Sequence, residues 1–138
     1  MRFHIHSDSF AILRLPADAE VPPWASAAFS SVTRTVDELS VVVPESRLPE
    51  SSQAEGEWRL LQVDGPLDLS QVGILASLAS PLAAAGISIF ALSTFDTDYV
   101  MVRDADLERA VAALEAAGHL ARWEGGVRAM RLTGGTDV

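Results

Sequence analysis

The sequence predicts an α+β fold, chiefly because of the order of elements in its second half. Residues 58–123 read as strand, helix, strand, strand, helix and strand, with Gly86 and Gly118 at the expected ends of the two helices. This order is typical of the split βαβ arrangement, in which helices cover one face of an antiparallel sheet. We therefore expect a ferredoxin-like βαββαβ sandwich.

The first helix of this sandwich is expected to begin at Asp68, after a strand at residues 58–63. Asp68 is an acidic capping residue and Gln71 follows three positions later, which is the spacing of a capping box. Pro81 lacks a backbone N–H and is expected to bend the helix near Ser77. Apolar residues recur at steps of three and four and predict the face that packs on the sheet. They are Leu75, Leu78, Ala79 and Leu82.

The remaining elements of this half follow from residue type. Residues 87–93 and 99–102 are rich in β-branched and aromatic side chains, which favours two strands joined by a short polar loop. Asp104 or Asp106 can cap the second helix. Residues 119–123 are expected to form the last strand.

The first half is predicted to repeat part of this pattern. Strands are expected at residues 10–15, 29–35 and 39–43, with a short helix that ends by Ala28. A shift of sixty residues aligns Leu39 with Tyr99, although the first half lacks a full first helix and a clear second one.

The sequence thus predicts two modules and a tail. Residues 1–56 form a degenerate first module, residues 57–124 a complete second one, and residues 125–138 a tail with a possible edge strand at 127–132. The most linker-like stretch, residues 47–56, supports this division because it contains Pro49 and two serines.

Composition narrows the range of functions. The chain has 138 residues, of which 49% are apolar, so it can bury one moderate core or two small modules that share a sheet. It contains no cysteine and no long apolar run or signal-like start, so we expect a soluble cytoplasmic protein that does not enter a membrane. A net charge of −9 opposes binding to a nucleic-acid backbone.

Polar groups at the ends of residues 68–102 suggest a site for a free amino acid. The backbone N–H groups of residues 70–73 can bind a carboxylate at the positive end of the helix dipole. Asp98 and Asp96 can accept hydrogen bonds from an ammonium group, Phe95 offers an apolar wall and Thr94 adds a hydroxyl. The same residues also suit a self-capped helix and an ordinary hairpin turn, so both interpretations stay open.

Other combinations of reactive residues are incomplete. His4 and His6 lie on one face of a strand, as two metal ligands would, but no further His or Cys is near them in sequence. Ser93, Asp98 and His119 lack the nucleophile elbow of a hydrolase. We therefore predict no metal site, no cofactor and no catalytic residues.

Several segments together resemble the ACT-domain proteins related to the cytosolic arginine sensors of animals. The most specific is STFDTDYVMV at residues 93–102, and GILA at 73–76, PL at 81–82 and ISIF at 87–90 accompany it. FSSVTRT at 29–35 and ELSVV at 38–42 are similar to small bacterial members with two ACT modules in tandem. The resemblance covers about residues 10–120.

The resemblance implies a non-catalytic regulatory sensor that binds an amino acid where ACT modules meet. Gln71 matches a position at which the arginine sensors place an acid facing the guanidinium, so a neutral amino acid is expected rather than arginine. Ser77 and Leu78 match positions that reach the pocket of an opposing module, which predicts a homodimer. The ligand-binding residues implied are Gln71, Gly73, Ile74, Ser77, Leu78, Thr94, Phe95 and Asp98.

Two alternatives from other functional classes remain. One is a protein-interaction module with a vestigial pocket. The other is a small enzyme in which Asp98 or His119 acts as an acid or base; it would require a perturbed pKa in a cleft.

Overall fold

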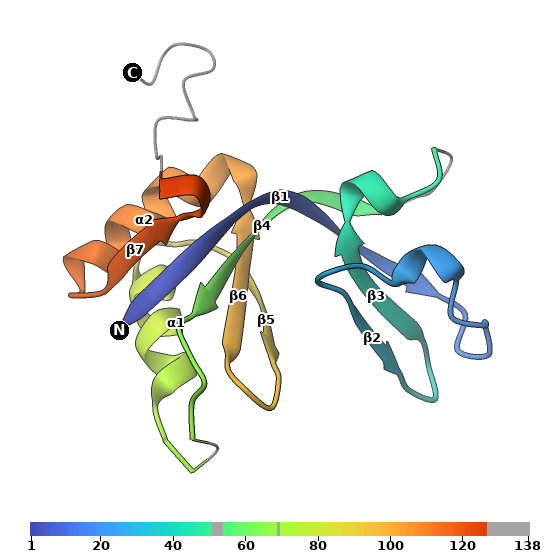
Figure 1. Cartoon of the computed structure of the whole chain (residues 1–138), viewed down its shortest axis with the longest axis horizontal. Coiled ribbons are helices and arrows are strands. Elements are labelled where there is room, and N and C mark those ends of the chain that lie inside the picture. The colour runs from blue at the N-terminus through green and yellow to red at the C-terminus, as the bar shows by residue number, and fades with distance from the viewer. Residues whose placement is uncertain (51–53, 69, 127–138) are drawn as a thin grey trace. The chain divides into compact units, whose positions relative to one another are not determined.

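The computed structural model describes residues 1–50, 54–68 and 70–126, and these residues form two compact units (Figure 1). Unit 1 comprises Met1–Ser7 and the residues from Leu60 onward, and unit 2 comprises Asp8–Arg59. Strands β1 (Arg2–Leu15) and β4 (Glu55–Val63) contribute residues to both units. The possible edge strand at 127–132 lies outside the described residues.

Unit 1 has the predicted α+β, ferredoxin-like order of elements. After β4 come α1 (Ile74–Ala84), β5 (Ile89–Ser93), β6 (Asp98–Arg103), α2 (Leu107–Ala116) and β7 (Leu120–Trp123). A short 3₁₀ turn, η3 (Asp104–Asp106), precedes α2. Figure 1 shows α1 and α2 together beside the strands of this unit. The predicted fold class is therefore confirmed.

The core of unit 1 joins both helices to the sheet. Leu78 and Leu82 of α1, as the periodicity predicted, pack in one buried cluster with strand residues such as Val100 and Val102. Leu107, Ala110, Val111 and Leu114 of α2 complete the helical side of the cluster. Gly86 and Gly118 both have positive φ, of 74° and 99°, and follow the last turns of the two helices as expected.

The first residues of β1 are an unexpected part of unit 1. Residues 2–5 of β1 pair in parallel with β7, so that Arg2 lies opposite Leu120 and Ile5 opposite Trp123. Phe3 and Ile5 are fully buried. Met1–Ser7 thus pack with the second half of the chain, whereas the predicted first module included them; the module boundaries themselves stay a prediction.

Unit 2 is a smaller antiparallel structure. β3 (Leu39–Pro44) pairs with residues 10–15 of β1 on one side and with β2 (Ser31–Arg34) on the other. Among its described residues, helical structure is confined to the 3₁₀ turns η1 (Pro23–Ala25) and η2 (Glu45–Arg47). The predicted short first helix is the single turn η1, and Pro22 and Pro23 stand at its start, where proline is favoured. Its buried core consists of Ala11, Leu13, Ala25, Leu39, Val41 and Val43.

The expected start of α1 at Asp68 is wrong. The contacts of a capping box do form, since Gln71 Oε1 accepts a hydrogen bond from the Asp68 N–H at 3.0 Å and Asp68 Oδ1 accepts one from the Ser70 N–H at 2.9 Å. They close a separate turn ahead of the helix. Gly73 then adopts a left-handed conformation with φ of 81°, and the helix begins at Ile74. A residue with positive φ cannot continue a right-handed helix, so the two segments stay distinct.

Pro81 is accommodated inside α1 by a hydrogen bond from outside the helix. In a regular helix the N–H of residue 81 would donate to the carbonyl of Ser77, but proline has no N–H. His119 Nε2 lies 3.0 Å from that carbonyl and donates to it. The His119 side chain is only 7% exposed, and its Nδ1 lies 3.1 Å from the Met1 amino group. His119 therefore has a structural role in α1, since it supplies the hydrogen bond that Pro81 cannot make.

Among the described residues, no helix is long and apolar enough to cross a membrane.

We predict that His119→Ala lowers the free energy of unfolding by about 1 to 3 kcal/mol, because it removes the donor to the part-buried Ser77 carbonyl. Pro81→Ala restores an N–H in the helix, so His119→Ala should cost about 1 kcal/mol less in that background. Urea unfolding of the wild type, both single variants and the double variant measures the difference. If His119→Ala lowers the free energy of unfolding equally in both backgrounds, His119 does not compensate for the N–H that Pro81 lacks.

Candidate ligand-binding site

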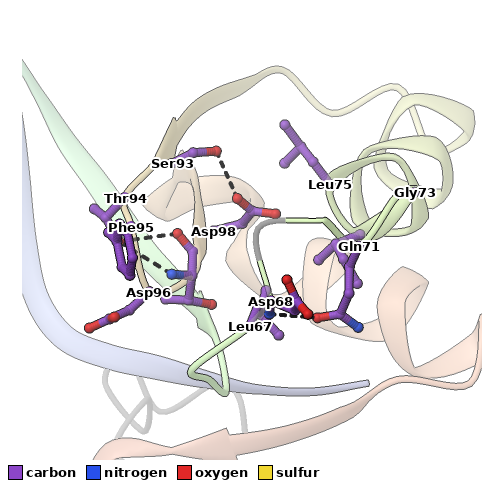
Figure 2. Close-up of a pocket in the computed structure, with 12 residues that line it drawn as sticks. Leu67, Asp68, Gln71, Gly73, Leu75, Ser93, Thr94, Phe95, Asp96 and Asp98 are labelled. Carbon is purple, nitrogen blue, oxygen red and sulfur yellow. Dashed lines mark hydrogen bonds between the residues drawn. The ribbon is translucent and has the colours of Figure 1, made fainter.

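Unit 1 contains a pocket of about 320 Å³ (Figure 2). This volume lies at the lower end of the range for small-molecule sites. The segment that leads into α1 forms one wall, and the loop between β5 and β6 forms the other. The lining residues are Leu67, Asp68, Gln71, Gly73, Ile74, Leu75, Ser93, Thr94, Phe95, Asp96, Thr97 and Asp98.

The two walls are tied together below the pocket. The Thr97 hydroxyl donates to the Val63 carbonyl at 2.7 Å, and the Leu67 N–H donates to the Asp96 carbonyl at 2.6 Å. A Cβ at Gly65 would lie 3.0 Å from the Asp96 carbonyl oxygen, so a larger residue would push the loop away. Thr97 is only 4% exposed. The end of β4 thus holds the β5–β6 loop in place.

The β5–β6 loop is also closed on itself. The Thr94 N–H donates to the Thr97 carbonyl at 2.9 Å, and the Thr97 N–H donates to the Thr94 hydroxyl at 3.3 Å. Ser93 and Asp98 are paired across the hairpin, and the Ser93 hydroxyl donates to Asp98 Oδ1 at 2.7 Å. The half-buried Asp98 carboxylate therefore has a fixed orientation, and Figure 2 shows it on the side of the loop that faces Leu75 and Gln71.

Carboxylates dominate the electrostatics of the pocket. Asp68, Asp96 and Asp98 line it, and no basic residue is among the lining residues. The pKa of Asp68 is lowered because the backbone N–H and the hydroxyl of Ser70 both donate to its carboxylate. The pKa of Tyr99 is raised, first by its partial burial and then by the negative charge of Asp96. Such a pocket favours a ligand with a positively charged group.

Most of the predicted site residues do meet at this pocket. Gln71, Gly73, Ile74, Thr94, Phe95 and Asp98 all line it. Phe95 is 78% exposed, so its ring lies at the rim instead of forming an inner wall. The sequence predicts that backbone N–H groups of residues 70–73 donate to a ligand's carboxylate. Two of these groups are already engaged, because the N–H groups of Ser70 and Gln71 donate to Asp68.

Ser77 and Leu78 do not line this pocket. The Ser77 hydroxyl donates to the Ile74 carbonyl at 2.8 Å, and Leu78 is 2% exposed in the core of unit 1. Leu78 therefore packs within its own unit. Whether either residue belongs to a site with a second chain stays a prediction.

Sequence reasoning missed other lining residues, including Leu67, Leu75, Ser93 and Thr97. Leu75 was assigned to the helix face that packs on the sheet. Ser93 could have been found from the hairpin pattern, because it and Asp98 are polar residues at the two ends of the loop between expected strands. Thr97 lies in the same polar loop, but its contact with Val63 had no sequence signal, because Val63 is 34 positions away.

We predict that Thr97→Val lowers the free energy of unfolding by about 1 to 3 kcal/mol, because it removes the buried hydroxyl that donates to Val63. The exposed Thr33 on β2 offers a matched control, and Thr33→Val should change stability by less than about 0.5 kcal/mol. Chemical denaturation measures both. Equal stability of the Thr97→Val variant and the wild type would show that this hydrogen bond does not anchor the loop.

Comparison with protein families identifies two segments of the chain. The family described as ACT domain matches residues 53–116. A second family, described as an N-terminal domain, matches residues 8–51, close to the extent of unit 2. Only the second half is thus matched as an ACT domain, and the prediction that the first half is a degenerate ACT module is not tested by these matches.

Individual relatives agree with the family match. The chain is 32% identical to the cytosolic arginine sensor for mTORC1 subunit 1 of Bos taurus over 103 residues, which is 68% of this chain and 31% of that protein. It therefore spans about a third of the length of this curated relative.

Solved structures give the same picture of the fold. The crystal structure of protein Atu0741 from Agobacterium tumefaciens is 39% identical with a TM-score of 0.82, covering 88% of this chain and 92% of that one. Aspartate kinase from Clostridium acetobutylicum has a TM-score of 0.61 at 17% identity, covering 80% of this chain and 33% of that enzyme. This second likeness concerns the fold alone.

Proposed function

The chain belongs to the ACT-domain proteins, and we propose that it is a non-catalytic regulatory sensor that binds a free amino acid in the pocket between α1 and the β5–β6 loop. The observation that carries the proposal is the fixed Asp98 carboxylate opposite the start of a helix. An amino acid is a zwitterion, so its site needs a negative group for the ammonium and a positive one for the carboxylate.

Asp98 is the proposed partner of the ammonium group. Ser93 holds one of its oxygens at 2.7 Å, and the β5–β6 loop is anchored to β4, so the carboxylate is ordered before a ligand arrives. A preorganised charged acceptor binds more strongly because little ordering is required at binding.

The start of α1 is the proposed partner of the carboxylate. The N–H groups of the first three helical residues, from Ile74 on, have no acceptor one turn earlier in the helix. They lie at the positive end of the helix dipole, which favours an anion. Gly73 has no side chain between this end and the pocket. The proposed carboxylate position is therefore a few residues later than the sequence suggested.

A neutral amino acid is the proposed ligand class. Gln71 lines the pocket with an uncharged side chain, and its Oε1 already accepts a hydrogen bond from the Asp68 N–H. A guanidinium buried against this neutral amide would have no counter-charge from it. Arginine, which the bovine relative is named for sensing, is therefore disfavoured at this position.

The proposed ligand response involves a homodimer. Phe95, which lines the pocket, is 78% exposed, and Val72, which lies between the lining residues Gln71 and Gly73, is 90% exposed. Large apolar side chains this exposed are often covered by a partner. A second copy that covers both would close the pocket over an amino acid, and binding would then stabilise one arrangement of the dimer.

The cytoplasmic location stays a prediction; the name of the cytosolic relative supports it.

We predict that one or more neutral amino acids raise the melting temperature of the protein in a screen of the twenty, because a ligand that binds only the native state stabilises it. Arginine should give a smaller shift. No shift at millimolar concentration with any amino acid would contradict the proposal and favour a protein-interaction module with a vestigial pocket.

Two variants assign the response to the pocket. Asp98→Asn removes the charge facing the ammonium and should weaken calorimetric affinity by about 1.5 to 3 kcal/mol, roughly tenfold or more. Asp96→Asn makes the same charge change in the same loop, where Figure 2 shows the side chain directed away from Asp98. This control should bind nearly as well as the wild type. Equal losses in both variants would indicate a general charge effect and place the ammonium elsewhere.

We predict a dimer that dissociates on Phe95→Ser, because the substitution removes exposed apolar surface from the proposed contact. Sedimentation velocity with and without a bound amino acid measures this. A monomer under both conditions would contradict the dimer, and the amino-acid proposal would then rest on the pocket of a single chain.

A further inference from the structure

A second group of chemically active side chains lies in unit 1, outside the pocket. His4, His6 and Glu124 each offer one atom that can ligate a metal ion, and these three atoms all lie within 4.8 Å of one another. Among the described residues, this is the one group of three or more His, Cys, Asp or Glu with that property. None of the three belongs to the proposed amino-acid site.

Strand pairing explains how residues from the two ends of the sequence meet. His4 and His6 alternate with the buried Phe3 and Ile5 on β1, so both imidazoles lie on the opposite face from the core. Ile5 pairs with Trp123 of β7, and Glu124 follows directly in the turn η4 (Glu124–Gly126). The third ligand was missed in the sequence because it is a carboxylate 118 positions beyond His6.

Neighbouring groups orient two of the three side chains. His6 Nε2 lies 2.8 Å from Gln62 Oε1 and donates to it, so the lone pair of a neutral ring is on Nδ1. Glu124 Oε1 accepts a hydrogen bond from the Ser7 N–H at 2.6 Å. Such outer partners commonly hold metal ligands in position.

The third side chain already contacts a cation. Arg122 Nη1 lies 2.8 Å from His4 Nδ1 and must be the donor, because a guanidinium has no lone pair to offer. The same guanidinium donates through Nη2 to Asp64 at 3.0 Å, so it keeps an ionic partner if it leaves His4. Arg122 is thus a competitor for the lone pair that a metal ion would use.

We propose that His4, His6 and Glu124 form a binding site for one divalent transition-metal ion of the zinc class, and that Arg122 competes with the ion at His4. Two imidazoles and one carboxylate suit Zn²⁺, which accepts nitrogen and oxygen ligands and leaves a position for water. They do not suit Mg²⁺, which prefers oxygen ligands.

The test is calorimetric titration of ZnCl₂ into the full chain, prepared without a histidine tag and stripped of metal. We expect one Zn²⁺ per chain and no heat of binding with MgCl₂. Glu124→Gln keeps an oxygen for the Ser7 N–H but removes the charged ligand, and should weaken Zn²⁺ binding by at least about tenfold. Glu115→Gln, an exposed carboxylate on α2, changes the net charge equally and should have no effect.

Arg122→Gln should bind Zn²⁺ more tightly than the wild type. The substitution frees the lone pair of His4 and removes a positive charge next to the ion. Melting temperatures of the metal-free variants show whether each is folded. The proposal is overturned if wild type binds no Zn²⁺ at millimolar concentration, if Glu124→Gln binds as tightly as wild type, or if Arg122→Gln binds more weakly.

Discussion

The anchoring of the β5–β6 loop to the end of β4 is the contact on which the candidate site depends. The buried Thr97 hydroxyl donates a hydrogen bond to the Val63 carbonyl, and the Leu67 N–H donates one to the Asp96 carbonyl. Gly65 has no side chain, so the loop can lie close to it. Without these contacts the loop would be an ordinary exposed hairpin turn. With them, two segments thirty residues apart form facing walls, and Asp98 is held at a fixed place between them.

The same region explains why a capping signal in the sequence was misleading. Asp68 and Gln71 make the reciprocal contacts that were expected of them, but Gly73 separates their turn from α1. The turn therefore becomes part of a pocket wall, and the start of the helix moves to Ile74. One glycine with positive φ thus separates the capping turn from the helix and leaves it in the pocket wall, which a pattern of residue types alone does not reveal.

Much of unit 1 could be predicted from sequence because its signals are local. Leu78 and Leu82 recur with helical spacing, and Gly86 and Gly118 follow the two helices, as predicted. The strand predicted at residues 99–102 lies within β6 (Asp98–Arg103). Parts that depend on distant pairing could not be predicted in the same way. Neither the pairing of residues 2–5 with β7 nor the partnership of His119 with the proline-containing helix has a local signal.

The candidate site shows the same division. Thr94 and Asp98 follow from a polar loop between two apolar strands, whereas Leu67 and Thr97 enter the pocket only through contacts made in three dimensions. Leu78 packs in the core of unit 1, as its helical spacing predicted, and the ligand role that the resemblance implies for it stays a prediction. A match to a family motif identifies the sequence position of a side chain, but it does not show which residues that side chain contacts in this protein.

The most direct measurement of the central claim is a titration of ¹⁵N-labelled protein with a neutral amino acid, followed by amide NMR shifts. Binding between α1 and the β5–β6 loop predicts that the shifts concentrate at residues 71–76 and 93–98. Shifts confined to unit 2, or no shifts with any amino acid at millimolar concentration, would contradict it.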